Sequence, residues 1–247
     1  MLRVVVSGFV WVVWLLVAAL WTPVVALTWS LTVWWDERRW WTSRVFRRGA
    51  NLLVTLNPFW RVKIEGELPD PNSAPFVAAC NHESLADVLI VGTLPFEMKW
   101  LSKADIARLP FIGWMMKMAG DVTVHRSDRR SRGASYDALI AWLERGSSVM
   151  MFPEGTRSRS GEMLPFRSGA FRLAIETCRP VQPLAVSGTR DAIRADSLVF
   201  GRARVTLRIL PQVPTAGLGE EDLDDLSDRV RAIIEAARIR QAPDSDA

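Results

Sequence analysis

The hydrophobic residues of this chain form one long apolar segment at the start, followed by shorter apolar runs that polar residues separate. From Val4 to Trp35 no residue is charged. Beyond about residue 60, runs typical of β-strands alternate with helical patterns, an order that favours an α/β sheet domain. We therefore predict an N-terminal membrane-associated helical segment with a basic linker at 1–48 and a single α/β domain at 49–247.

The pattern within this domain predicts roughly seven strands flanked by helices. Strands are assigned from alternating or continuous apolar residues, and helices from a 3.6-residue period and suitable end residues. The predicted strands run from Trp60 to Glu65, Phe76 to Cys80, Lys99 to Ser102, Asp121 to Val124, Val149 to Phe152, Gln182 to Ser187 and Val205 to Ile209. The predicted helices run from Ala86 to Leu94, Phe111 to Met118, Ser131 to Arg145, Ser168 to Cys178 and Asp222 to Arg240, before a frayed tail at 242–247.

The N-terminal apolar run is too long for one straight membrane crossing. As a single helix, its roughly 32 residues would measure about 48 Å, against about 30 Å for the hydrocarbon core of a bilayer. Pro23 lies inside the run and has no backbone N–H with which to continue a helix. We therefore predict two helices, Val4 to Thr22 and Val24 to Trp41, arranged as a hairpin or as a span followed by an interfacial helix.

Tryptophan is concentrated in the same segment, where eight of the twelve Trp residues precede residue 42. Because Trp favours the interface between lipid and water, we expect a hairpin that dips into the cytoplasmic leaflet. The alternative is a cleaved signal peptide with Arg3 as its charged n-region and Val4 to Leu20 as its apolar h-region. The apolar run continues beyond any cleavage point, however, and no clear A-x-A site is present.

Positive charges follow the apolar segment directly. The basic residues are Arg38, Arg39, Arg44, Arg47 and Arg48. By the charge bias of membrane insertion they place the rest of the chain on the cytoplasmic side, so we expect a protein of the cytoplasmic (inner) membrane. Arginines at this point are also suited to anionic headgroups.

Composition excludes several other classes of protein. Two cysteines and two histidines are too few for a disulfide scaffold or a usual zinc site. The net charge of +4 includes 27 acidic residues, and no face that combines aromatic and basic residues is evident. We therefore expect no metal and no nucleic-acid partner.

The first candidate for chemistry is the segment from Asn81 to Asp87, which follows a predicted apolar strand and enters a helix. A His at the carboxyl end of a buried strand lies where α/β folds place functional groups. Asp87, five residues after His82, is placed to turn back and accept a hydrogen bond from the imidazole, which leaves the other ring nitrogen to act as a base. The alternative is a His and an Asp that only cap the helix.

The second candidate is the segment from Phe152 to Ser158, which also leaves an apolar strand and turns through Pro and Gly. Gly155 permits a tight turn and a close ligand approach. Glu154 offers an acceptor, and Arg157 offers a fork that suits phosphate. An anionic ligand is the natural partner, whereas a charged surface turn is the alternative.

Taken together, these segments resemble the glycerolipid acyltransferase family, which includes the lysophosphatidic acid acyltransferases. The family's four blocks are matched in order by Asn81, His82 and Asp87, by Gly120, Val122, Val124 and Arg126, by Phe152 to Ser158 in full, and by Val181, Pro183 and Val186. Two further pieces agree, at 102–105 and at 165–170, although the family more often has Lys where this chain has Arg167. The resemblance covers about residues 51 to 211 and implies a glycerol-3-phosphate acyltransferase-like fold with a mixed sheet.

The resemblance implies direct acyl transfer from a thioester, acyl-CoA or acyl-carrier protein, to the free hydroxyl of 1-acylglycerol-3-phosphate. His82 would remove the proton from that hydroxyl, and Asp87 would orient His82. The residues expected to bind the glycerol phosphate are Lys103, Arg126, Glu154, Gly155, Thr156 and Arg157. No cofactor is implied, and the expected partners are the two substrates and the membrane.

Two other functions are weighed against this one. Another lyso-lipid, such as a lyso-ornithine lipid, would lack the phosphate that Lys103, Arg126 and Arg157 together favour. A membrane lipid-binding or scaffolding protein that has lost catalysis would show a damaged His and Asp pair, but His82 and Asp87 are both present.

Overall fold

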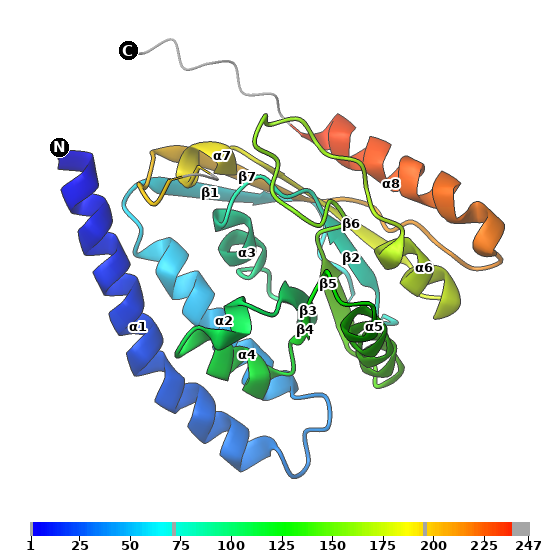
Figure 1. The fold of residues 1–247 in the computed structure, drawn as a ribbon, viewed down its shortest axis with the longest axis horizontal. Coiled ribbons are helices and arrows are strands. Elements are labelled where there is room, and N and C mark those ends of the chain that lie inside the picture. Colours follow the sequence, from blue (N-terminus) through cyan, green and yellow to red (C-terminus); the bar gives the residue numbers. More distant parts are fainter. Residues whose placement is uncertain (1, 71–72, 195–196, 239–247) are drawn as a thin grey trace.

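The computed structural model describes residues 2–70, 73–194 and 197–238. At its N-terminus two helices, α1 (Leu2–Thr32) and α2 (Trp40–Thr55), run side by side in opposite directions (Figure 1). A helical hairpin is therefore present, as predicted, but its second helix is Trp40–Thr55 and not the predicted Val24 to Trp41. By length and composition α1 is a candidate membrane span.

The hairpin bends at a different place from the one predicted. α1 continues through Pro23, because packing on both sides of the proline holds the two halves in one helix: Ala18 and Val25 both pack with Met115. The chain turns instead at residues 33–39, where Asp36 accepts a hydrogen bond from the Trp41 N–H at 2.9 Å. The predicted break at Pro23 is wrong, since tertiary contacts outweigh one missing helical hydrogen bond.

Within the described residues, seven strands form one mixed sheet in the order β1-β7-β6-β2-β5-β3-β4. Five of them are parallel to one another, whereas β1 and β7 run in the opposite direction. The strands are β1 (Trp60–Glu65), β2 (Val77–Cys80), β3 (Met98–Lys103), β4 (Val122–Val124), β5 (Ser148–Met151), β6 (Val181–Ser187) and β7 (Ala203–Ile209). The predicted fold class is confirmed, and each predicted strand lies within two residues of the observed one.

Helices cover both faces of the sheet. They are α3 (Ala86–Val91), α4 (Ile112–Ala119), α5 (Arg129–Glu144), α6 (Gly169–Glu176), α7 (Thr189–Ala192) and α8 (Leu223–Ala237), with 3₁₀ turns at Ile106–Arg108 and Glu220–Asp222. The sequence did not predict the short α7. The predicted end of α8 at Arg240 and the tail at 242–247 lie outside the described residues.

Alternating side chains of β2 divide the core into two layers. Ala78 and Cys80 face the layer that includes α1, α2 and α3, whereas Val77 and Ala79 face the layer built from α5, α6 and α8 (Figure 1). All four side chains are fully buried. A strand covered on both faces explains the continuous apolar sequence of β2.

The N-terminal hairpin and the sheet domain share one of these layers. Val10 and Trp14 of α1 are buried, and the Trp14 ring lies 5.6 Å from that of Trp60 and 5.0 Å from that of Phe200. The predicted boundary at residue 48 therefore separates two sequence segments whose side chains pack in a common core.

Arginines of the hairpin hold it against the domain. Arg38 and Arg39 donate to the carbonyl oxygens of Gly146 and Lys117, at 3.1 and 2.7 Å. Arg47 forms an ion pair of 2.5 Å with the buried carboxylate of Asp121. These three arginines, which were expected near lipid headgroups, contact the protein itself.

Candidate active site

The predicted site residues lie at one edge of the sheet, because the strands that carry them are parallel. His82 follows β2, Glu154 follows β5, Arg126 follows β4, and Lys103 is the last residue of β3. Their carboxyl ends meet at the same edge, which is where open α/β sheets bind ligands. The chain thus brings together residues that are as much as 72 positions apart.

His82 and Asp87 are in direct contact. One carboxylate oxygen of Asp87, Oδ2, lies 2.8 Å from His82 Nδ1 and accepts the backbone N–H groups of Glu83 and Ser84 at 2.7 and 2.8 Å. Asp87 is fully buried, whereas 15% of the His82 side chain is exposed. A carboxylate at this position favours a proton on Nδ1, which leaves Nε2 with the lone pair that a base requires.

The backbone around His82 is fixed by its neighbours. The Asn81 side-chain amide forms two hydrogen bonds with β6. Its NH₂ group donates to the Val186 carbonyl at 2.9 Å, and its oxygen accepts from the Val186 N–H at 2.8 Å. The Ser84 hydroxyl donates to the Ile193 carbonyl at 2.7 Å. On its face, the His82 ring stacks on Phe152 with 4.1 Å between ring centroids. These contacts hold the imidazole in one orientation before any substrate binds.

Glu154 connects the two sequence blocks. Its Oε1 accepts the His82 N–H at 2.6 Å, and its Oε2 accepts the Leu164 N–H at 2.9 Å, while the His82 carbonyl accepts the Ser158 N–H at 2.9 Å. The side chain is buried, and burial raises the pKa of its carboxyl group. Both carboxylate oxygens of Glu154 accept backbone N–H groups, so the side chain holds the His82 backbone in position. Its expected contact with substrate stays a prediction.

The basic side chains at this edge differ in their hydrogen bonds and ion pairs within the protein. Arg126 donates to the Gly155 carbonyl, and burial together with the nearby Arg167 lowers its pKa. Lys103 is exposed and forms an ion pair with Asp105. In the part of the chain that the structure describes, the half-buried Arg157 has no hydrogen-bond or ion-pair partner. Arg157 is therefore the cation most available for an anionic ligand.

The conformation of the loop after β5 requires a glycine at position 155. The next residue, Thr156, is exposed to solvent. Gly155 has φ +70°, and a Cβ added there would lie 2.7 Å from the Arg167 side chain. A larger residue would be strained and would displace Arg167. The turn thus lies against two guanidinium groups, that of Arg167 and that of Arg126, which donates to the Gly155 carbonyl.

Sequence reasoning missed one ionic contact at the site. Glu83, next to His82, forms a 2.5 Å ion pair with Arg238 at the end of α8. Burial raises the pKa of Glu83 to about 7, although the Arg238 guanidinium acts in the opposite direction. A contact between residues 155 positions apart leaves no local signal in the sequence.

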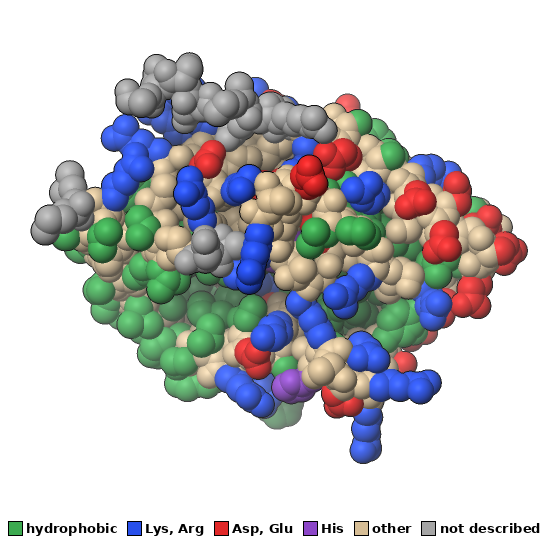
Figure 2. Space-filling view, turned by 45° about the horizontal axis from the view of Figure 1, so that its top comes forward, with side chains coloured by type: hydrophobic (Ala, Val, Ile, Leu, Met, Phe, Trp, Pro, Cys, Tyr) green, Lys and Arg blue, Asp and Glu red, His purple; other side chains and the backbone are tan. Residues whose placement is uncertain are grey.

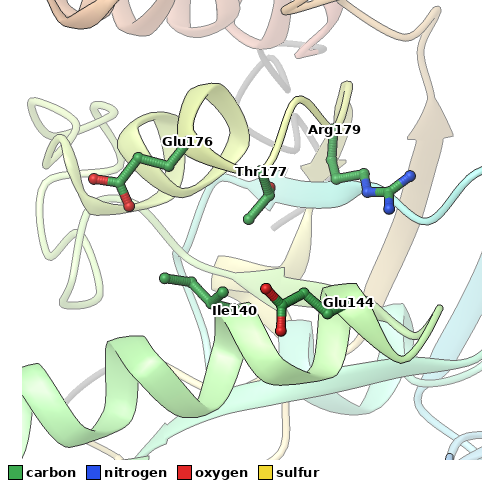
Figure 3. Close-up of a pocket in the computed structure, with 5 residues that line it drawn as sticks. All are labelled: Ile140, Glu144, Glu176, Thr177 and Arg179. Carbon is green, nitrogen blue, oxygen red and sulfur yellow. The ribbon is translucent and has the colours of Figure 1, made fainter.

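A shallow pit of about 400 Å³ lies elsewhere, between α5 and α6 (Figure 3). Its lining residues are Ile140, Glu144, Glu176, Thr177 and Arg179, and it contains none of the predicted site residues. Among the residues that the structure describes, no group of three His, Cys, Asp or Glu side chains is arranged to hold a metal ion.

Comparison with known proteins agrees with this geometry. The family model described as Acyltransferase matches residues 61–187, which includes the His82 and Phe152 to Ser158 blocks. The chain belongs to the acyltransferase family. The match covers more than half of the chain and runs from β1 to the end of β6, so it includes the strands whose carboxyl ends carry the predicted site residues.

Relatives within the acyltransferase family share a name. The 1-acyl-sn-glycerol-3-phosphate acyltransferase of Saccharomyces cerevisiae is 32% identical over 78% of this chain and 63% of its own length. The alpha form of Homo sapiens is 33% identical over 69% and 61%, and the chloroplastic LPAT1 of Arabidopsis thaliana is 38% identical over 62% and 44%. The chain thus spans about half the length of the relatives it matches.

A solved acyltransferase has the same fold. The 1-acyl-sn-glycerophosphate acyltransferase PlsC of Thermotoga maritima superposes with a TM-score of 0.79, and the match covers 95% of both chains. Sequence identity is 22%, so this likeness concerns the fold. Because coverage is almost complete, the shared fold includes the N-terminal hairpin as well as the sheet.

Proposed function

We propose that this acyltransferase moves a fatty acyl group from an acyl thioester to the free sn-2 hydroxyl of 1-acyl-sn-glycerol-3-phosphate, making phosphatidic acid for phospholipid biosynthesis. The observation that carries the proposal is the contact between His82 and Asp87, at a sheet edge where Arg157 is available for an anion. The shared name of the relatives supports the same substrate.

In the proposed reaction His82 acts as general base. Its Nε2 takes the proton of the acceptor hydroxyl as the oxygen attacks the thioester carbonyl carbon, and the new C–O bond forms. The C–S bond then breaks, and the imidazolium returns the proton to the departing thiolate. Asp87 stabilises the imidazolium between these steps, through the 2.8 Å contact with Nδ1.

The acceptor phosphate is assigned to the cations of the same edge. Arg157 supplies the principal contact, because its guanidinium has no partner among the described residues and can bind phosphate with two parallel hydrogen bonds. Lys103 and Arg126 add positive charge on the adjacent strands, and the Gly155 and Thr156 turn allows the ligand to approach the backbone. Glu154 acts through His82, to whose N–H it is bound.

The acyl donor is acyl-CoA or acylated acyl-carrier protein. Both carry the same thioester, and the proposed chemistry with either one needs no cofactor, because the reacting groups all belong to the substrates and His82. The two donors differ in the carrier, so direct comparison of their kcat/KM values identifies the physiological class.

We also propose that α1 lies in the cytoplasmic leaflet of the inner membrane and presents the sheet edge to the cytoplasm. Hydrophobic side chains gather over the side of the molecule where α1 lies, beside a face that is rich in Lys and Arg (Figure 2). The proposal is supported by the exposure of Leu20, Leu27 and Trp34 at 74%, 62% and 88%. A single cysteine placed before Arg3, in a Cys178→Ser background, should resist labelling from the outer side of intact cells. Labelling would show a full span.

Assays of the purified protein in detergent test the function. Acyl-CoA or acylated acyl-carrier protein is supplied with 1-acylglycerol-3-phosphate, and thiol release and phosphatidic acid are both measured. The proposal predicts thiol release that depends on the acceptor and an equal amount of phosphatidic acid. Faster transfer to a lyso-ornithine lipid would overturn the phosphate-bearing acceptor, and acceptor-independent thiol release would overturn acyl transfer itself.

A further inference from the structure

The C-terminal end of α8 reaches the catalytic segment through one side chain. Arg238 follows the last residue of α8, and its guanidinium donates to Glu83 Oε1 at 2.5 Å, to the Gly161 carbonyl at 2.6 Å and to Glu235 Oε2 at 2.9 Å. Only 12% of the Arg238 side chain and 9% of that of Glu83 are exposed. A buried fork with three acceptors is held in one geometry.

Other arginines hold the same loop, which follows the Phe152 to Ser158 block. Arg190 donates to the carbonyls of Arg159 and Ser160 at 3.1 and 2.7 Å, and Arg231 of α8 donates to that of Met163 at 3.0 Å. Loop 159–163 is therefore fixed through its backbone oxygens by three guanidinium groups. Arg238 differs from the other two because it also binds Glu83.

Glu83 is engaged at both its backbone and its side chain. Its N–H donates to Asp87 Oδ2 at 2.7 Å, while its carboxylate accepts from Arg238. The charged groups that act on this carboxylate are Arg238, Asp87 and Glu154, of which two are acids. Arg238 opposes the effect of burial on Glu83, so without it the buried carboxyl group would keep its proton to higher pH or turn away from these acids. Either response moves the N–H that supports Asp87.

We propose that Arg238 is a positioning residue of the acyl-transfer site, which pairs with the Glu83 carboxylate and thereby holds the segment from His82 to Asp87 against loop 159–163. The inference rests on the proposed function for its kinetic consequence. It assigns to α8 a role beyond packing, since Leu226, Val230 and Ile234 anchor the helix in the core and so fix where Arg238 stands.

Steady-state kinetics of Arg238→Gln give the first test. The kcat should fall roughly 10- to 100-fold, because small displacements of a catalytic group are costly, while the KM of each substrate changes about twofold at most. Arg238→Lys keeps the charge but loses the fork, so its kcat should lie between those of the wild type and Arg238→Gln. Arg229→Gln, an exposed position on the same helix, is the control and should match the wild type.

The double variant Glu83→Gln with Arg238→Gln tests the pairing itself. A neutral amide at position 83 needs no cation, so the double variant should recover kcat by roughly threefold or more over Arg238→Gln alone. Losses that multiply would mean that Arg238 acts independently of Glu83 and would overturn the inference. Because the pair is removed together, this variant also avoids an unpaired buried charge if Arg238→Gln alone fails to fold.

Hydrogen exchange of the peptide that contains Glu83 and Ser84 gives a readout without catalysis. Both N–H groups are bound to Asp87, so their exchange should be slow in the wild type, faster in Arg238→Gln and unchanged in Arg229→Gln. If the wild type transferred no acyl group to 1-acylglycerol-3-phosphate, the proposed function would fail while this exchange still tested Arg238. Unchanged exchange in a folded Arg238→Gln protein would overturn the inference.

Discussion

Replacement of Asp87 by Asn tests how the carboxylate supports His82. Three N–H groups converge on Asp87 Oδ2, from His82 Nδ1, Glu83 and Ser84. Asn has a single acceptor oxygen, which should take the place of Oδ2, because the opposite orientation would direct an NH₂ group at these three donors. The His82 tautomer is then kept, but the negative charge that stabilises the imidazolium is lost.

The magnitude follows from the two consequences of this change. General-base catalysis is typically worth about 10² to 10⁴ in rate, so a loss near 10³ is expected, which equals about 4 kcal/mol in the activation free energy. The Asn NH₂ group would occupy the position of Oδ1, which is buried and has no hydrogen-bond partner among the described residues. An unpaired buried donor costs about 1 to 3 kcal/mol of unfolding free energy.

The assay measures kcat with saturating acyl thioester and acceptor, together with the unfolding temperature of the same sample. A protein that retains most of its stability but loses about 10³ in kcat has lost chemistry and not the fold. Asp137→Asn, on the exposed side of α5, is the matched control and should change neither quantity. If Asp87→Asn kept more than about a tenth of the wild-type kcat, the carboxylate would not serve His82 in the way described.

Three further outcomes follow from the structure. Arg157→Ala should raise the acceptor KM by roughly 10- to 100-fold and leave the donor KM near its wild-type value, because one charge-assisted contact to phosphate is lost; an equal rise in both would refute the assignment. Since the pKa of Glu83 is about 7 in the folded protein and its ordinary value is 4.5, the folded state holds a proton between these pH values. The free energy of unfolding should therefore fall as pH rises from 4.5 to about 7 in the wild type, but not in Glu83→Gln. If the unfolding temperatures of the two proteins changed with pH in the same way, this prediction would be contradicted. Trp14→Ala should lower the unfolding free energy by about 3 to 5 kcal/mol, whereas Trp34→Ala, at an 88% exposed position, should have little effect; equal shifts in unfolding temperature would count against the shared core.

The sequence predicts the sheet well because the strands carry local signals. β2 is a continuous apolar run between turn residues, and β6 is apolar apart from Gln182 and Ser187, so a single strand length of sequence contains the signal for each. The pairing of His82 with Asp87 is also local, since it spans five positions at the start of a helix. Order along the sheet, in contrast, is set by contacts between distant segments, which the pattern alone leaves open.

The N-terminal segment shows where local signals mislead. Pro23 predicts a helix end, yet the packing of Ala18 and Val25 on Met115 keeps α1 continuous. Trp14 fits a lipid interface by composition, but it lies in the core against Trp60 and Phe200. Both outcomes depend on residues that fold onto the segment from elsewhere in the chain.

At the site, residue type indicated which side chains could contact substrate, but not which of them are already bonded within the protein. Glu154 and Arg157 belong to the same seven-residue block, and the sequence treats both as substrate contacts. The structure buries Glu154 against the His82 N–H and leaves Arg157 uncommitted among the described residues. Arg238 had no local signal at all, because its partner Glu83 lies 155 positions away.

The most direct test of the account is the transfer rate of purified His82→Ala with an acyl thioester and 1-acylglycerol-3-phosphate. His82 is the only described group at this edge with a ring nitrogen held by Asp87, so its loss should lower kcat by about 10² to 10⁴ while the unfolding temperature stays close to that of the wild type. His125→Ala, the other histidine of the chain, serves as the control and should remain active. Phosphatidic acid formed by His82→Ala at more than about a tenth of the wild-type rate would contradict the assignment of His82 as the base.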